Sequence, residues 1–311
     1  MLDVLTITLN PAIDQTVSID DFKIDQVNRV SKIQNDPGGK GINVAAYLAA
    51  SGLKVGASGF LGENNPSLFQ NIFEKININD MFVYISGDTR TNVKIVDEKN
   101  KTVTDVNQAG FTIQKENIQK LEEILFNEKR ATWYVFSGSL PKGINSDIYK
   151  KWIQKAHELD IKIALDASGD SLKEALSAKP DLIKPNHHEL SQILDKDLKT
   201  KQELIDEAKK LLSQGVQKVC ISMGEEGALI FDKDKAFKAL PGKVNIKTTV
   251  GAGDSMLSGL VLADIKKLSL DESIKIATAY SMGAVETVGP YLPSKDKIEE
   301  YKNKIEIKDL S

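Results

Sequence analysis

Cysteine is almost absent from this chain of 311 residues, since Cys220 is the only one. One thiol cannot form an internal disulfide or a cysteine metal cluster, which is typical of a protein from a reducing compartment. Cys220 lies in a β-prone run, so an inert core thiol is a more natural interpretation than a nucleophile. Histidine is also scarce: His187 and His188 are adjacent, and His157 is the only other. This spacing disfavours a zinc site.

Neither sign of charge is in large excess, because 41 basic and 44 acidic residues leave a formal net charge of −3. This balance provides no bulk attraction for nucleic acid or acidic membranes, so any anion site must be local. The sequence contains no run of about 18 apolar residues, and its first residues carry no basic segment typical of a secretory signal. We therefore expect a cytoplasmic protein without nucleic-acid or membrane partners.

The pattern from residue 116 onward predicts an α/β fold. Helical and β-prone segments alternate there, as they do in right-handed βαβ units. We expect a mostly parallel sheet with helices on both faces. Helices are predicted near 115–127, 145–158, 170–178, 200–213 and 270–287, and strands at 133–137, 162–166, 181–184, 219–222 and 229–232.

The first third of the chain combines such elements with a second group of short strands. Strands are predicted at 4–9, 55–60 and 82–85 and helices at about 41–49 and 66–76, whereas 16–19, 27–33, 91–96 and 102–107 are short β-prone pieces. We expect one domain over residues 1–311, with a small β-sheet lid inserted in two pieces, about 12–36 and 88–109. An exposed apolar face on such a lid would favour a homodimer formed through it.

Residues 248–255, with the sequence TTVGAGDS, lie directly before a run with helical spacing. Gly251 and Gly253 allow close backbone approach, so several N–H groups can converge on an anion at the helix start. Asp254 would be repelled by a bound polyphosphate unless the site needs a base, as phosphoryl transfer does. The alternative interpretation is a glycine turn capped by Asp254.

A second glycine-rich helix start, GGKGIN at residues 38–43, carries Lys40. A lysine at such a position usually faces an anion, although a solvated lysine is the alternative. Ligands of an open parallel sheet bind beyond the carboxyl ends of its strands. Polar clusters follow several predicted strands there, at Asp14, 38–43, 137–139, 184–186, 222–224 and 251–254. Together they predict a site for a polar small molecule.

Several of these segments resemble the signatures of the phosphofructokinase-B family of sugar kinases. The segment GGKGINVA at 38–45, with Gly52 and Gly62, is similar to the family's N-terminal signature, and TVGAGD at 249–254 to its C-terminal one. The Asn186-His187-His188-Glu189 segment resembles its Asn-x-x-Glu motif. The resemblance extends from residue 9 to about 289. It implies a ribokinase-like, doubly wound sheet, a small β-sheet lid, and phosphoryl transfer from Mg-ATP to a ketohexose phosphate.

Within the family, the substrate-facing segments look most like the branch that phosphorylates fructose 1-phosphate at O6 to give fructose 1,6-bisphosphate. The branch acting on tagatose 6-phosphate is the nearest sibling. The segments that carry this resemblance are 8–14, 27–29, 90–94 and 104–107.

The resemblance also implies roles for individual residues. Asp254 would be the general base, with backbone N–H groups from Gly251, Ala252 and Gly253. Lys40 and Arg90 would bind the phosphate of the substrate, with Arg29 of the lid as a further cation, although Arg90 could instead pair with Asp105. Glu189 would hold Mg²⁺ through water, or be a surface helix residue. The other predicted contacts are Asp14, Gly38, Gly39, Asn43 and Ser139 for the sugar phosphate and Lys184, Asn186, Ser222, Gly224 and Gly227 for ATP.

Two other classes of function are alternatives to a sugar kinase. A dinucleotide-dependent oxidoreductase would need a Gly-x-Gly-x-x-Gly motif after the first strand, where Asn10-Pro11 stands instead. A non-catalytic sugar-phosphate-binding protein is the other alternative. Asp254 argues against it, because a carboxylate beside phosphates weakens their binding.

Overall fold

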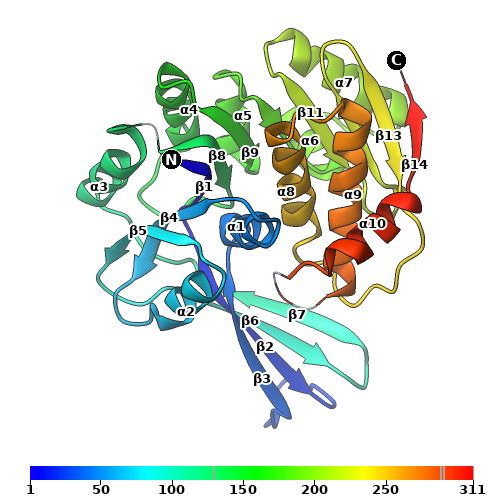
Figure 1. Cartoon of the computed structure of the whole chain (residues 1–311). Helices are drawn as coiled ribbons and strands as arrows, with labels where there is room; N and C mark the ends of the chain where they lie inside the picture. The colour runs from blue at the N-terminus through cyan, green and yellow to red at the C-terminus, as the bar shows by residue number, and fades with distance from the viewer. Residues whose placement is uncertain (129, 288, 290, 311) are drawn as a thin grey trace.

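The computed structural model describes residues 1–128, 130–287, 289 and 291–310, and it has two separate β-sheets (Figure 1). The larger sheet has ten strands in the order β14-β13-β12-β11-β10-β9-β8-β1-β4-β5, and the smaller has four in the order β3-β2-β6-β7. In the part of the chain that is described, no helix has the length and apolar character needed to cross a membrane.

Seven neighbouring strands of the large sheet are parallel, as the alternating pattern predicted. They are β1 (Leu2–Thr8), β4 (Val55–Gly62), β5 (Asn79–Ile85), β8 (Ala131–Ser137), β9 (Lys162–Asp166), β10 (Leu182–Ile183) and β11 (Lys218–Ser222). Antiparallel strands extend one edge: β12 (Ala228–Phe231), β13 (Ala236–Leu240) and β14 (Glu306–Asp309). The sequence predicted only β12 of these three.

Helices cover both faces of the large sheet, and each face has its own hydrophobic core. Adjacent residues of a strand point to opposite faces, so Val4 packs into one core and Leu5 into the other. The first core contains α1 (Lys40–Ala50), α2 (Ser67–Lys75), α8 (Ala252–Ile265), α9 (Leu270–Glu286) and α10 (Lys295–Asn303). The second contains α3 (Lys115–Phe126), α4 (Ile148–Glu158), α5 (Gly169–Leu176), α6 (His187–Ile193) and α7 (Lys201–Ser213).

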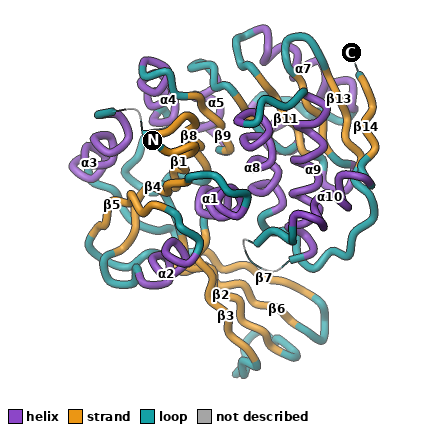
Figure 2. The backbone as a smooth tube through the Cα atoms, in the orientation of Figure 1, coloured by secondary structure: helices purple, strands orange, loops and turns teal. Residues whose placement is uncertain are grey.

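The small sheet projects from the body of the molecule, and we call it the lid sheet (Figure 2). It consists of β2 (Ala12–Ile19), β3 (Lys32–Gly38), β6 (Thr91–Asp97) and β7 (Thr102–Asn107). Strands β2 and β6 pair in parallel, while β2 with β3 and β6 with β7 are antiparallel. The pairing of β2 with β6 thus joins two segments that are far apart in the sequence into one sheet. The description of residues 1–311 as one domain stays a prediction.

One predicted β-prone piece of the lid sheet, residues 27–33, is mostly wrong, because β3 begins only at Lys32. The preceding residues form a loop in which the Asn28 side chain accepts a hydrogen bond from the Lys23 N–H at 2.9 Å and donates one to the Lys23 carbonyl at 2.8 Å. Such local side-chain bonds compete with strand pairing.

Candidate active site

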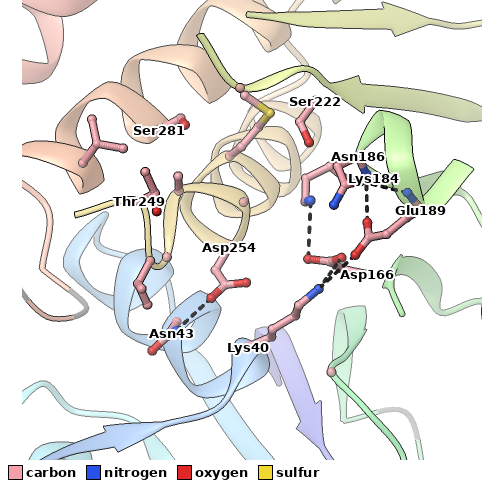
Figure 3. Close-up of a pocket in the computed structure, with 18 of the residues that line it drawn as sticks. Lys40, Asn43, Asp166, Lys184, Asn186, Glu189, Ser222, Thr249, Asp254 and Ser281 are labelled. Atoms are coloured by element: carbon pink, nitrogen blue, oxygen red, sulfur yellow. Dashed lines mark hydrogen bonds and ion pairs between the residues drawn. The ribbon is translucent and has the colours of Figure 1, made fainter. Parts of the chain in front are cut away.

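A cavity of about 1090 Å³ lies beyond the carboxyl ends of the parallel strands, between the start of α1 and the start of α8 (Figure 3). Each of the strands β8, β9, β10 and β11 contributes residues to its wall from its carboxyl end or from the loop that follows it. Of the predicted site residues, those that line it are Asp14, Gly39, Lys40, Asn43, Arg90, Ser139, Lys184, Asn186, Glu189, Ser222, Gly224, Gly227, Gly251, Ala252, Gly253 and Asp254.

Gly38 and Arg29 are the predicted residues that do not line this cavity. Gly38 lies behind Asp14, and a Cβ atom on Gly38 would come within 2.2 Å of the Asp14 carboxylate. A glycine is therefore required there for Asp14 to keep its position. Arg29 is exposed in the loop between β2 and β3 and is not among the residues that line the cavity.

The glycine loop before α8 has the geometry of an anion cradle. Gly251 precedes the helix in the left-handed conformation, with φ 81°. A Cβ atom would come within 2.7 Å of the Tyr47 hydroxyl at Gly251 and 3.2 Å of Lys184 Nζ at Gly253. Because the first N–H groups of a helix have no partner within it, backbone donors and a lysine ammonium meet here.

Asp254 lies in the first turn of α8 with 6% of its surface exposed. Its Oδ2 accepts a hydrogen bond from Asn43 Nδ2 at 2.8 Å. Burial, followed by repulsion from Asp166, raises the pKa of Asp254 to about 6. The helix has Gly251 as its N-cap and no side-chain capping bond, so the capping interpretation of Asp254 is wrong. A carboxylate with this pKa can accept a proton at neutral pH.

Asp166, at the end of β9, is a central residue of the cavity that the sequence did not identify. Its Oδ1 is 3.0 Å from Lys40 Nζ, and its Oδ2 is 3.5 Å from Lys184 Nζ. Burial would raise the pKa of Asp166, but attraction by Lys184 and Lys40 outweighs it and lowers the pKa. Polar residues at the end of a buried strand were the available signal.

Glu189 lies in the cavity wall at the start of α6. Its Oε2 accepts from the Asn186 N–H, and Asn186 Oδ1 accepts from the Glu189 N–H, both at 2.8 Å, which is a capping box. Its Oε1 lies 3.9 Å from Lys40 Nζ and takes no part in the capping box. One carboxylate oxygen therefore stabilises the helix start and the other faces the site.

Lys40 and Arg90 both line the cavity but have different partners within the protein, and their predicted role at one phosphate stays a prediction. Lys40 points toward Asp166 and Glu189 (Figure 3). Burial would lower the pKa of Lys40, but attraction by Asp166, Asp254 and Glu189 raises it.

Arg90 lies at the junction of the lid sheet with the body. It donates to the carbonyls of Pro11 at 3.2 Å, Gln108 at 2.8 Å and Asn10 at 2.9 Å. Its predicted alternative partner, Asp105, is instead the register neighbour of Lys94. A guanidinium has five N–H donors, so two remain after these three bonds.

Two residues beside Asp14 and Arg90 were also missed by the sequence analysis. Asn92 Nδ2 donates to Asp14 Oδ1 at 3.1 Å, and burial raises the pKa of Asp14 despite this bond. Asn10 Nδ2 lies 3.4 Å from both Ser139 Oγ and the Ala109 carbonyl. Both asparagines occur in segments that the sequence singled out, but only the register of β2 with β6 places Asn92 opposite Asp14.

A model described as pfkB family carbohydrate kinase matches residues 3–297. A 1-phosphofructokinase from Rhodobacter capsulatus is 38% identical over 311 residues, covering 99% of this chain and 98% of the relative. A tagatose-6-phosphate kinase from Staphylococcus epidermidis is 36% identical over 312 residues, covering 98% and 99% respectively.

Among solved structures, phosphofructokinase-2 from Escherichia coli in complex with fructose-6-phosphate superimposes with a TM-score of 0.88. It is 27% identical and covers 97% of this chain and 99% of its own. The predicted ribokinase-like fold and the resemblance of the two glycine signatures are confirmed. The chain belongs to the pfkB family of carbohydrate kinases.

Proposed function

We propose that this kinase transfers the γ-phosphoryl group of Mg-ATP to O6 of fructose 1-phosphate, giving fructose 1,6-bisphosphate. The observation that carries the proposal is Asp254, a buried carboxylate with a raised pKa at the mouth of a backbone anion cradle. Phosphoryl transfer requires a cradle for the phosphates and a base at the acceptor hydroxyl. Curated relatives of full length carry the name 1-phosphofructokinase.

In the proposed reaction, Asp254 takes the proton from the O6 hydroxyl as O6 forms its bond to the γ-phosphorus. The bond from that phosphorus to the bridging oxygen of ATP breaks, and ADP leaves with the electron pair. Asn43 orients the base through its bond to Oδ2. The N–H groups of the 251–253 segment and the Lys184 ammonium stabilise the negative charge on the transferring group.

The two sides of the cavity suit the two substrates. Lys184, Asn186, Ser222, Gly224 and Gly227 come from the neighbouring ends of β10 and β11, and we assign them to ATP. We assign Asp14, Gly39, Asn43 and Ser139 to the sugar phosphate, and Gly38 leaves the space in which the Asp14 carboxylate lies.

The two cations take different phosphates in this proposal. Arg90 has two donors that its bonds to the described residues do not use, and we assign these donors to the substrate phosphate. Lys40, because of its partners, is assigned to the transferring group.

The residues present fit a magnesium ion held together with the nucleotide. Within the described residues, no group of three or more His, Cys, Asp or Glu side chains could hold a metal by itself. Magnesium in kinases is bound by one or two carboxylates plus substrate phosphates and waters. Glu189 Oε1, left free by the capping box, is the oxygen that we assign to it. When bound, the ion would neutralise charge on the phosphates.

Tagatose 6-phosphate is the second candidate substrate, because a relative of that name is 36% identical over nearly the whole chain. In a ketohexose furanose, C2 and C5 each carry a hydroxymethyl arm. A site that clamps phosphate on one arm presents the other to Asp254, so both sugars would give a 1,6-bisphosphate. Their ring hydroxyls differ, and an unpaired polar group costs about 1–3 kcal/mol. We therefore expect cross-reactivity within roughly tenfold to a hundredfold.

The test is a coupled assay of ADP release with fructose 1-phosphate, tagatose 6-phosphate, fructose 6-phosphate and free fructose. We expect the highest kcat/KM for fructose 1-phosphate and very poor use of free fructose, which lacks the anion for Arg90. A higher kcat/KM for tagatose 6-phosphate would overturn the substrate assignment. Efficient use of free fructose would overturn the phosphate clamp, and binding of sugar phosphate without ADP release would favour the non-catalytic alternative.

We also propose a homodimer formed through the lid sheet. Residues alternate between the faces of a strand, so the face opposite Asp14 carries Val93 and Ile95 of β6 and Val106 of β7. Val106 is 54% exposed. An apolar sheet face that water reaches is typical of a surface covered by a partner.

Light scattering on Val106→Lys tests this assembly. We expect the variant to be monomeric and Val103→Lys, on the other face of the same strand, to remain dimeric. A monomeric wild-type protein would refute the assembly.

A further inference from the structure

Asp166 is placed so that two lysines from distant parts of the chain share its carboxylate. Lys40 begins α1 and Lys184 follows β10, and each approaches a different oxygen, at 3.0 Å to Oδ1 and 3.5 Å to Oδ2. The Asp166 side chain is 1% exposed and that of Lys184 is 4% exposed. Burial of a charge is costly unless the charge is paired, and two neighbouring ammonium groups also repel each other. The Asp166 carboxylate offsets both effects by pairing with Lys40 and Lys184.

Both lysines are also close neighbours of the residues around Asp254. Lys184 Nζ lies against Gly253, which precedes Asp254 in α8, and Lys40 begins the helix whose Asn43 bonds to Asp254. Within the described parts of the chain, neither ammonium lies within 4.0 Å of an Asp254 oxygen. The lysines are thus directed to Asp166 although a second carboxylate is nearby.

We propose that Asp166 is a positioning residue of the phosphoryl transfer, which holds Lys40 and Lys184 toward the nucleotide side and keeps them from pairing with Asp254. A lysine paired with Asp254 would stabilise its ionised form and make it a poorer base. The inference rests on the proposed function, because it assigns a task to Asp166 within that reaction.

Charged and titratable groups from several elements of the described chain face Asp254. Lys40 and Tyr47 approach from α1, Asp166 from β9 and Lys184 from β10. Asp166 repels the Asp254 charge, whereas the lysines attract it. Removal of the Asp166 charge therefore acts twice in the same direction, since repulsion is lost and the released lysines gain access to Asp254. Both changes lower the pKa of Asp254.

The first experiment follows Asp254 directly, by pH titration of the ¹³C-labelled aspartate carboxyl groups in the ligand-free protein. The Asp254 signal is assigned as the one lost in Asp254→Asn. We expect its pKa to fall by about 1–3 units in Asp166→Asn, the usual effect of an opposite charge coming close. In Lys40→Met we expect a rise, because an attracting charge is lost. An unchanged pKa in Asp166→Asn, or a fall in Lys40→Met, would overturn the proposal.

The second experiment measures kcat/KM against pH, which reports the free enzyme's base. In Asp166→Asn we expect the acid limb of this pH profile to move to lower pH by the same number of units as the pKa of Asp254. At pH values above the limb we expect kcat/KM to be lower than in the wild type. Wild type and variant are measured with the same sugar phosphate, so ionisation of the substrate affects both profiles equally. A uniform loss of activity with an unmoved acid limb would mean that Asp166 is only structural, and would refute the inference.

Asp264→Asn is the matched control. Asp264 also bridges two lysines, Lys218 at 2.6 Å and Lys162 at 2.9 Å, but it lies at the other end of α8. It should leave both the Asp254 titration and the acid limb unmoved; a shift equal to that of Asp166→Asn would overturn the proposal. The carboxyl titration needs no turnover. A protein inactive on every sugar would thus refute the proposed function while the titration still decides the role of Asp166.

Discussion

Replacing Asp254 with asparagine should make the protein more stable at alkaline pH while removing its activity. The ionised carboxylate is buried in the folded state, which raises its pKa from 3.8 to about 6. Asparagine is neutral, has nearly the same shape, and keeps an oxygen that can accept the bond from Asn43. The variant removes the cost of burying the charge without creating a cavity.

The size and direction of the effect follow from proton linkage. Between pH 3.8 and about 6 the folded protein binds more protons at Asp254 than the unfolded chain does. The free energy of unfolding therefore falls as pH rises through this window. A difference of about two pKa units at about 1.4 kcal/mol each gives about 3 kcal/mol. At pH 8 this cost lowers the free energy of unfolding of the wild type in full and does not affect that of Asp254→Asn. Near pH 4 the free energies of unfolding of the two proteins should converge.

Urea denaturation of both proteins at pH 8 and pH 4 measures this difference. Asp264→Asn is a control of opposite sign: burial raises the pKa of Asp264, but bonds from Lys218 and Lys162 outweigh burial and lower it. That variant should therefore lose stability at pH 8. Equal stability of Asp254→Asn and the wild type at pH 8 would mean that burial of the Asp254 charge does not destabilise the fold. It would refute the explanation of the raised pKa of Asp254 by burial.

Three further substitutions test the cradle, the metal ligand and the phosphate clamp. Gly251→Ala should impair turnover, because its Cβ atom would come within 2.7 Å of the Tyr47 hydroxyl. Gly52→Ala is the control: Gly52 also has a positive φ, 86°, but its Cβ atom would have no atom within 4 Å, so this variant should lose stability and keep its kinetics. Equal kinetics in the two variants would contradict the role of the 251–253 segment as an anion cradle. Glu189→Gln should keep the capping bond yet raise the Mg²⁺ concentration for half activity, and an unchanged dependence would leave Glu189 a purely structural role. Arg90→Ala should raise KM for the sugar phosphate by about ten- to a hundredfold, the value of a charge-assisted hydrogen bond, with little change for ATP. Equal losses for both substrates would place Arg90 at the nucleotide.

The sequence predicted those parts of the molecule that depend on local pattern. Glycine, lysine and aspartate at close spacing identified both helix starts, and alternating periodicity identified the parallel strands. These signals lie within one segment each, so they need no knowledge of which segments become neighbours.

The missed features depend on pairing across long separations. Asp166 resembles any aspartate that ends a strand until folding brings Lys40, 126 residues away, to within 3.0 Å. Strand β14 is a short polar segment that becomes a strand by pairing with β13. Arg90 was identified as a site residue, but its bonds to three backbone carbonyls could not be predicted. Every residue has a backbone carbonyl, so the sequence does not show which carbonyls will lie near an arginine.

The most direct test of the central claim is the identity of the product. The protein is incubated with Mg-ATP and fructose 1-phosphate, and ³¹P NMR follows the phosphates, with Asp254→Asn as the control. We expect ADP together with a second sugar phosphate on C6, formed at least about a hundredfold more slowly by the variant. Release of inorganic phosphate without a bisphosphate, or equal rates for the two proteins, would contradict it.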